Sequence, residues 1–320
     1  MHFVRVRICD ANGNLCPQAN HLIAFSTSGE GKFRAAANGD AANLDLFHLP
    51  KHHAFAGELT AIVEGNCTLT ATAKGLKKAI ITIQQLKSAY EAHYQKSATD
   101  IFFSPGRVNL IGEHTDYNGG FVFPCALSFG TYLLIAANNE KKINFCSLNV
   151  EATYSLALDE LTKPMPDKAW ANYPLGVLAQ FLKRGVVIEQ GYDILFWGNV
   201  PAGAGLSSSA AMEVVTAFAF NELLGTGYDR TELAKIGQKA EHEFAGVMCG
   251  IMDQFASAHG KQDHAIYLNC DTLEFDLVPV KLEGIKVVVS NTHSPHHLDS
   301  GAYNDRVRQC QLAVQQISTV

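Results

Sequence analysis

The sequence predicts an all-β sandwich followed by a mixed α+β domain. Short alternating segments separated by glycines fill residues 1–84, which is typical of a small sandwich of β-strands. Helical spacing of apolar side chains begins after Gln84, and strands then mix with longer helices. We therefore place a boundary near residues 84–88, with one domain over residues 1–84 and a second over residues 87–320.

The first domain is predicted strand by strand. Apolar and polar side chains alternate in MHFVRVRICD, and the following Asn12-Gly13 pair favours a tight turn. Further strands are expected at HLIAFSTS, GKFRAAA, GELTAIV, CTLTATA and AIITIQ. The next segment, LKSAYEAHYQKS, predicts a helix over residues 86–97 from the spacing of Leu86, Tyr90 and Tyr94.

The second domain begins with a dense group of polar side chains between apolar flanks. FFSPGRVNLIGEHTDYNGG spans residues 102–120 and places Arg107 among apolar neighbours, where an unpaired cation would be costly. Its EHTDY segment gathers two acids, a histidine and a tyrosine within five positions. Donors and acceptors at this density suit a polyhydroxylated ligand such as a sugar, and a solvated turn is the alternative interpretation.

The segment NVPAGAGLSSSAAMEV joins a predicted strand, residues 191–200, to an apolar helix. Pro201 ends the strand because proline cannot donate to a sheet ladder, and Gly225 is suited to end the helix. Glycines let a ligand approach the backbone, and the first N–H groups of a helix attract phosphate. No Lys or Arg lies between Gly198 and Val214. For this fragment alone, an ordinary turn with a serine cap is therefore the stronger interpretation.

Two further acidic residues lie in predicted helices. Asp229 and Glu232 have the spacing of a capping box, and Glu241 lies beside the apolar stripe of the helix that they begin. The local pattern favours a half-exposed Glu241 on the helix flank; the alternative is a packed carboxylate that needs a partner. Asp253 lies in the first turn of a helix that Gly250 opens, where the helix dipole favours a negative charge.

Composition limits the classes of function. The chain has a net charge of −6 and a pI near 6.1, which gives no basic footprint for nucleic acid. Its eight cysteines form no C-x-x-C pair and no zinc spacing, which predicts reduced thiols in a cytoplasmic protein. No signal-peptide pattern and no apolar run of membrane length is apparent. We therefore expect a monomer without nucleic-acid or membrane partners.

Four segments of the second domain together resemble the galactokinase family, whose superfamily includes the homoserine, mevalonate and phosphomevalonate kinases. PGRVNLIGEHTDYNGG is similar to the family signature, and NVPAGAGLSSSAAMEV to the superfamily's nucleotide loop. AEHEFAGVMCGIMDQFAS resembles the segment that contains the catalytic base, and SGAYNDRVRQC a later segment that contacts the sugar. The resemblance implies an α+β domain of the galactokinase/mevalonate kinase type that uses ATP and Mg²⁺ to phosphorylate the C1 hydroxyl of galactose.

The resemblance also implies a role for each matching residue. Asp253 would take the proton from the sugar, and Arg107 would stabilise Asp253 as the anion. Ser209 and Glu241 would hold Mg²⁺, for which hard oxygen ligands are suited. The galactose would be bound by Glu113, His114, Thr115, Asp116, Gly250 and Tyr303. The ATP would be bound by Ser147, Gly203, Ala204, Gly205, Leu206, Ser207, Ser208 and Ser209.

The family pattern is not present in full. No glycine-rich segment comparable to the family's third motif follows Gly260. The resemblance therefore implies a kinase domain that is incomplete in its C-terminal half, which can impair activity. The alternatives are a non-catalytic galactose-binding protein or sensor, and a kinase of another sugar such as N-acetylgalactosamine.

The first domain has a resemblance of its own. DANGNLCPQANHLIAFSTSGEGKFRAAANGD, HHAFAGELTAIV and LTATAKGLKKAIITI are similar to the immunoglobulin-like C-terminal domain of family 2 glycoside hydrolases of the β-galactosidase type. This resemblance implies an immunoglobulin-like sandwich over residues 1–84. The module is an accessory in that family, so glycosidase activity does not follow from it.

Overall fold

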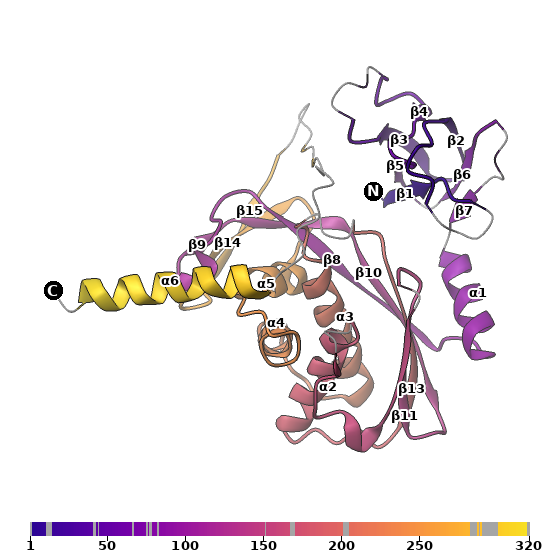
Figure 1. The fold of residues 1–320 in the computed structure, drawn as a ribbon. Coiled ribbons are helices and arrows are strands. Elements are labelled where there is room, and N and C mark those ends of the chain that lie inside the picture. Colours follow the sequence, from indigo (N-terminus) through magenta and orange to yellow (C-terminus); the bar gives the residue numbers. More distant parts are fainter. Residues whose placement is uncertain are drawn as a thin grey trace. The chain divides into compact units, whose positions relative to one another are not determined.

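The computed structural model (Figure 1) describes the chain apart from residues 1, 11–14, 41–42, 44, 66, 75, 77–78, 82, 151, 167–169, 201–204, 282–286, 288, 290–299 and 319–320. It divides into two compact units. One comprises Met1–His93 with Val287–Ser294, and the other comprises Tyr94–Lys286 with Pro295–Val320. Helix α1 (Ile83–Tyr94) ends at this division.

The first unit contains two antiparallel sheets that share one apolar core. The first sheet has the order β1-β5-β3, from β1 (His2–Arg7), β5 (Glu58–Glu64) and β3 (Lys32–Ala37). The second has the order β4-β2-β6-β7, from β4 (Lys51–His53), β2 (Leu22–Gly29), β6 (Cys67–Thr72) and β7 (Ala79–Ile81). Alternating side chains of both sheets form the core, among them Val6, Phe25, Leu59 and Leu69. The predicted all-β sandwich is confirmed.

The second unit is built on a five-stranded sheet. Its order is β12-β11-β13-β10-β8, from β12 (Thr153–Ala157), β11 (Lys142–Ser147), β13 (Gly191–Gly198), β10 (Pro124–Asn138) and β8 (Asp100–Asn109). Only β11 and β13 pair in parallel among these described strands. A smaller sheet has the order β15-β14-β9, from β15 (Phe275–Pro279), β14 (His264–Asn269) and β9 (Phe121–Val122).

The central strand β13 is buried on both faces from Gly191 to Phe196. Its one carboxylate, Asp193, is only 6% exposed and is neutralised by Lys96, whose Nζ lies 2.6 Å from Oδ2. Asn138 and Asn144 donate to the other oxygen at 2.9 and 2.7 Å. A charge can therefore lie in the middle of this sheet because every part of it has a partner.

Helices cover one side of the large sheet (Figure 1). They are α2 (Asn172–Lys183), α3 (Ser208–Leu224), α4 (Arg230–Ala240) and α5 (Met252–His259). Helix α3 contacts β8 and β10 directly and is buried along most of its length, as its apolar sequence predicts. It ends at Gly225 in a left-handed conformation, and Asp229 caps α4 by accepting from the Glu232 N–H at 2.8 Å. Both predicted helix ends are confirmed.

A single π-helical turn, Glu241–Ala245, follows α4, and the long helix α6 spans Ser300–Ser318. Short 3₁₀ turns lie at Asp116–Asn118, labelled η1, and at Leu158–Glu160. In the described part of the chain, no helix combines the length and apolar character that a membrane span requires. The α+β class predicted for this region is confirmed.

Candidate active site

The predicted site residues come from distant segments of the second unit. The end of β8 supplies Arg107, the turn around η1 supplies Asp116, and the beginning of α3 supplies Ser207. The beginning of α5 supplies Asp253, and the first turns of α6 supply Tyr303.

Arg107 and Asp253 form the centre of this group. The guanidinium donates from Nε to Asp253 Oδ1 and from Nη2 to Oδ2, both at 2.8 Å. Its third nitrogen, Nη1, donates to the Gly205 carbonyl at 2.6 Å. Gly106 permits this close passage of β8 beside the loop, because a Cβ there would lie 2.7 Å from the Leu206 carbonyl oxygen. The cation missing from the loop sequence is thus provided by a strand about a hundred residues earlier.

Ser207 connects the loop to the same carboxylate. Its hydroxyl donates to Asp253 Oδ2 at 2.6 Å, and its backbone has left-handed angles of φ 59° and ψ 49°. It holds the N-cap position of α3, yet its side chain makes no capping hydrogen bond to that helix. The expected serine cap is therefore wrong, because the hydroxyl is engaged by Asp253. No described side chain accepts from the first N–H groups of α3, which suits an anion.

The remaining loop residues are placed as follows. Ser208 and Ser209 form the first turn of α3, and Leu206 is buried and accepts from the Arg107 backbone N–H at 3.3 Å. Gly203 and Ala204 lie outside the described residues. Ser147 ends β11, is 8% exposed, and accepts from the Asn149 N–H at 3.2 Å.

Asp116 lies against Gly250. An added Cβ at Gly250 would clash with the Asp116 carboxylate, so only glycine leaves room for that side chain. Burial, with a further contribution from the negative charge of Asp253, raises the pKa of Asp116 to about 6, against a smaller opposing effect of Arg107. Two acids and one arginine therefore share one partly buried region.

Three rings form the next part of the site. The Tyr303 ring lies 5.4 Å from that of Tyr117 and 6.4 Å from that of His114, between centroids. The Tyr117 hydroxyl and His114 Nδ1 are 2.7 Å apart. Helix α6 is held here by Asn304, which accepts from the Met248 N–H at 2.8 Å and donates to the Gly246 carbonyl at 2.9 Å.

Glu113 and Thr115 differ in their surroundings. Glu113 is exposed and accepts from Asn109 at 3.2 Å. The Thr115 hydroxyl lies 2.7 Å from the Gly112 carbonyl and 2.8 Å from that of Phe121. Thr115 thus holds the backbone of its own loop, and its contact with substrate stays a prediction.

Glu241 is 4% exposed, so the half-exposed position favoured by the local sequence is wrong. Helix α2 packs against the π-helical turn, and Gln254 of α5 donates to the Glu241 side chain, so the residue is enclosed by elements other than its own helix. Burial, together with the charge of Asp253, raises its pKa above the usual range, and hydrogen bonds that include one from Ser209 act in the opposite direction. Ser209 and Glu241, the two predicted metal ligands, are therefore close enough to interact.

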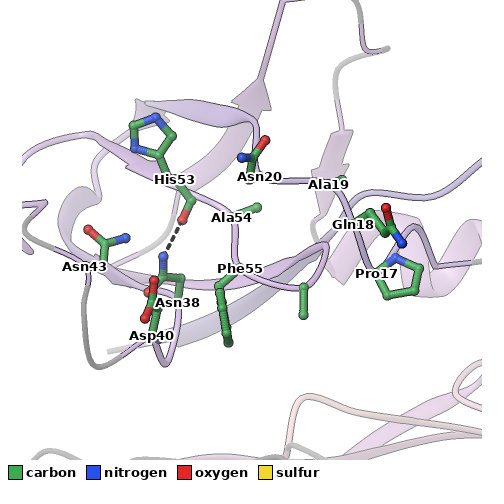
Figure 2. Close-up of a pocket in the computed structure, with 11 residues that line it drawn as sticks. Pro17, Gln18, Ala19, Asn20, Asn38, Asp40, Asn43, His53, Ala54 and Phe55 are labelled. Carbon is green, nitrogen blue, oxygen red and sulfur yellow. Dashed lines mark hydrogen bonds between the residues drawn. The ribbon is translucent and has the colours of Figure 1, made fainter.

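A pocket of about 450 Å³ lies in the first unit (Figure 2). Its polar groups are largely used within the sandwich. Asn38 donates to the His53 carbonyl at 2.9 Å and accepts from the Asp40 N–H at 3.0 Å. The His53 ring in turn lies 2.8 Å from Asp45. These bonds hold loops of the sandwich together and by themselves indicate no ligand.

Three family models match the chain. The galactokinase galactose-binding signature matches residues 88–137, and the GHMP kinases N terminal domain matches residues 172–261. The glycoside hydrolase family 2 C-terminal domain 5 matches residues 1–82. The part of the chain that follows the first domain is thus similar to galactokinases and other GHMP kinases, and we call it the galactokinase-family region.

Curated relatives agree with the galactokinase-family models. The galactokinase of Clostridium acetobutylicum is 46% identical over 239 residues, which are 74% of this chain and 60% of that protein. The galactokinase of Fusobacterium nucleatum is 48% identical over 231 residues, or 72% of this chain and 59% of that protein. The chain thus spans about 60% of the length of these relatives.

Solved structures support the fold of the galactokinase-family region. Lactococcus lactis galactokinase, crystallised with galactose, matches with a TM-score of 0.68 and 35% identity, over 74% of this chain and 62% of that one. Mevalonate kinase of Methanococcus jannaschii matches with a TM-score of 0.51 and 21% identity, over 59% of this chain and 58% of that one. The second likeness concerns the fold alone.

Sequence reasoning missed two residues beside Glu241 in the galactokinase-family region. Glu213 and Gln254 are both fully buried and hydrogen-bonded to each other at 2.9 Å. One signal was available, since Glu213 is the only charged residue in the apolar stretch SSSAAMEVVTAFAF. An acid at that position of a buried helix requires partners, and the sequence alone does not say which.

Proposed function

We propose that the galactokinase-family region transfers the γ-phosphoryl group of ATP to the C1 hydroxyl of galactose. The observation that carries this proposal is the two-bond pair between Arg107 and Asp253 beside the uncapped N-terminus of α3. A general base, a cation and a phosphate-binding helix end are the parts that this reaction needs at one place.

The proposed step is a direct displacement. Asp253 accepts the proton of the C1 hydroxyl while the sugar oxygen attacks the γ-phosphorus. The bond from that phosphorus to the β–γ bridging oxygen breaks, and the products are galactose 1-phosphate and ADP. Arg107 keeps Asp253 oriented through two bonds and adds positive charge beside the phosphates. Backbone N–H groups at Ser208 and Ser209 bind phosphate oxygens.

The residues around Glu241 fit a Mg²⁺ ion that enters with ATP. Glu213 Oε1 is buried and has no hydrogen-bond partner among the described residues, and burial and the nearby Glu241 raise the pKa of Glu213 well above its usual range. A cation would relieve this local excess of negative charge. Described His, Cys, Asp and Glu side chains form no cluster of three possible ligands. Mg²⁺ commonly binds with few protein ligands plus nucleotide phosphates.

In this proposal Ser209 and Glu241 hold the ion, which when bound neutralises charge on the phosphates. Asp116 and the rings of His114 and Tyr303 bind the sugar. Free thiols at all eight cysteines and the use of ATP support a cytoplasmic location. The monomeric state stays a prediction. The relatives named above are galactokinases, which does not favour a sensor or a kinase of another sugar.

The test is direct product detection. The purified chain is incubated with MgATP and galactose, N-acetylgalactosamine or glucose, and sugar 1-phosphate is followed by ³¹P NMR. Product with galactose alone is expected. Product only with another sugar would reassign the substrate, and galactose binding without product would support a sensor. Absence of both binding and product in a folded chain would contradict the proposal.

A further inference from the structure

Gln254 connects two buried carboxylates. Its Nε2 donates to Glu213 Oε2 at 2.9 Å and to Glu241 Oε2 at 2.7 Å. The three residues come from α5, α3 and the π-helical turn, and their exposed fractions are 0%, 0% and 4%. One amide thus holds together side chains from three elements that are separate in the sequence.

Burying the polar groups of these three residues costs free energy. No ion pair joins Glu213 or Glu241 to a cation among the described residues. Glu213 Oε1 and Gln254 Oε1 are both buried without a partner in that same part of the chain. An apolar side chain of similar volume would commonly fill such a space at no loss of stability. The polar trio is therefore better explained by what it does for Glu241 than by stability.

Close packing fixes the trio from a second side. Gly237 of α4 faces it, and a Cβ there would lie 3.1 Å from Gln254 Cγ and 3.3 Å from Glu213 Cβ. Both side chains therefore pack closely against α4. Two of the hydrogen-bond donors on Glu241 also share one of its oxygens. Both Gln254 Nε2 and the Cys249 Sγ, at 3.4 Å, use Oε2, so neither occupies Oε1.

We propose that Gln254, oriented by Glu213, is a positioning residue that fixes the Glu241 carboxylate for the divalent cation that accompanies ATP. This inference rests on the proposed function. Glu213 accepts a hydrogen bond from one N–H of the Gln254 amide. This bond sets the direction in which the other N–H of the same amide points. The second N–H donates to Glu241 Oε2, so Gln254 itself does not compete with the cation for Oε1. Outer residues that orient a metal ligand commonly affect metal affinity by about 10- to 100-fold.

The experiment measures metal selectivity rather than turnover. ATP is titrated into the purified chain by calorimetry with Mg²⁺ and with EDTA, and the ratio of the two Kd values is recorded. Gln254→Met keeps the volume but removes the donor, and Glu213→Leu removes the group that orients it. Each is expected to reduce the ratio about 10-fold or more, with little change in the Kd for metal-free ATP. Glu222→Gln, an exposed change on α3, is the matched control.

The variant Glu213→Gln distinguishes the hydrogen bond that orients Gln254 from the negative charge of Glu213. Its amide oxygen can accept from Gln254 Nε2, and its NH₂ group can donate to Gln254 Oε1, which has no partner among the described residues. It is therefore expected to restore most of the ratio lost in Glu213→Leu. If Glu213→Gln lowers the ratio of Kd values as much as Glu213→Leu does, the positioning role is overturned. The negative charge of Glu213, and not its hydrogen bond, would then determine the preference for MgATP.

Two further outcomes are decisive. An unchanged ratio in Gln254→Met, while the wild-type chain prefers MgATP, overturns this inference and leaves the proposed function intact. A folded wild-type chain that binds no ATP overturns both. Should Gln254→Met fail to fold, Gly237→Ala tests the same point, since its methyl group must displace Gln254 and Glu213 by a few tenths of an ångström. It is expected to lower the ratio, and an unchanged ratio again overturns the inference.

Discussion

Arg107 and Asp253, 146 residues apart in the sequence, meet in two parallel hydrogen bonds of 2.8 Å. The pair is partly shielded, with exposed side-chain fractions of 13% and 26%. Guanidinium and carboxylate planes that match in this way fix orientation as well as charge. Asp253 is therefore held in one direction before any ligand arrives.

Replacing Asp253 by asparagine tests its role as the base. The amide keeps the size of the side chain but cannot take up the sugar proton. Turnover should fall by about 10²- to 10⁴-fold, the usual contribution of general-base catalysis. Galactose affinity, measured by calorimetry, should change little. Turnover that survives the change would assign proton removal to another group.

Replacing Arg107 by lysine tests the geometry of the pair. Lysine keeps the charge but cannot make both Asp253 bonds and the 2.6 Å bond to the Gly205 carbonyl together. We expect kcat/KM to fall by about 10²-fold, the order seen when one preorganised donor is lost. Arg308→Lys is the matched control, since Arg308 pairs with Asp305 on the exposed side of α6. If both changes lower kcat/KM equally, the guanidinium geometry of Arg107 has no special role.

Replacing Asp116 by asparagine should stabilise the fold at neutral pH. The folded pKa is about 6, above the ordinary value of 3.8, so the folded state binds more protons than the unfolded state between these values. The contribution of Asp116 to the free energy of unfolding is therefore present in acid. It is lost as the pH rises toward and above 6. The asparagine side chain has no such ionisation to oppose.

The expected gain for Asp116→Asn at pH 7.5 is roughly 1–3 kcal/mol, at about 1.4 kcal/mol per pKa unit. It should vanish near pH 4. Urea denaturation at the two pH values measures it, with Asp276→Asn on β15 as an equal charge change at an exposed position. A variant that is less stable than wild type at pH 7.5 would show that the Asp116 carboxylate is stabilising in the folded state.

Replacing Gly250 by alanine should weaken sugar binding specifically. The added methyl group would occupy the position of the Asp116 carboxylate and force that side chain away. Galactose affinity should fall at least about tenfold, or about 1.4 kcal/mol. Gly301→Ala in α6 is the control, because a Cβ there meets no atom within 4 Å. Unchanged galactose affinity in Gly250→Ala would remove Asp116 from the sugar site.

Much of the architecture follows from local pattern. Alternation predicted the strands of the sandwich, and the apolar run after the serines predicted the buried helix α3. Its end at Gly225 and the cap at Asp229 follow from residues next to each helix end. These features depend on contacts within a few residues, which is the range over which sequence periodicity carries information.

The geometry of the site could be predicted less well from the sequence. The burial of Glu241 depends on elements elsewhere in the sequence, among them α2, so its own helix indicated the wrong exposure. A serine hydroxyl is the usual local cap and was expected for α3, where Ser207 holds the N-cap position. A distant carboxylate, Asp253, accepts from the Ser207 hydroxyl instead. Single-sequence patterns do not contain such pairings, whereas family resemblance names the residues without giving their bonds.

Ser207 shows a trade-off between stability and chemistry. A non-glycine residue with φ near +59° costs of order 1 kcal/mol or more, and glycine would relieve that cost. Glycine would also remove the only side-chain hydroxyl that donates to Asp253 among the described contacts. Relief of backbone strain and a well-held base therefore favour different residues at this one position, and serine is the one that serves the base.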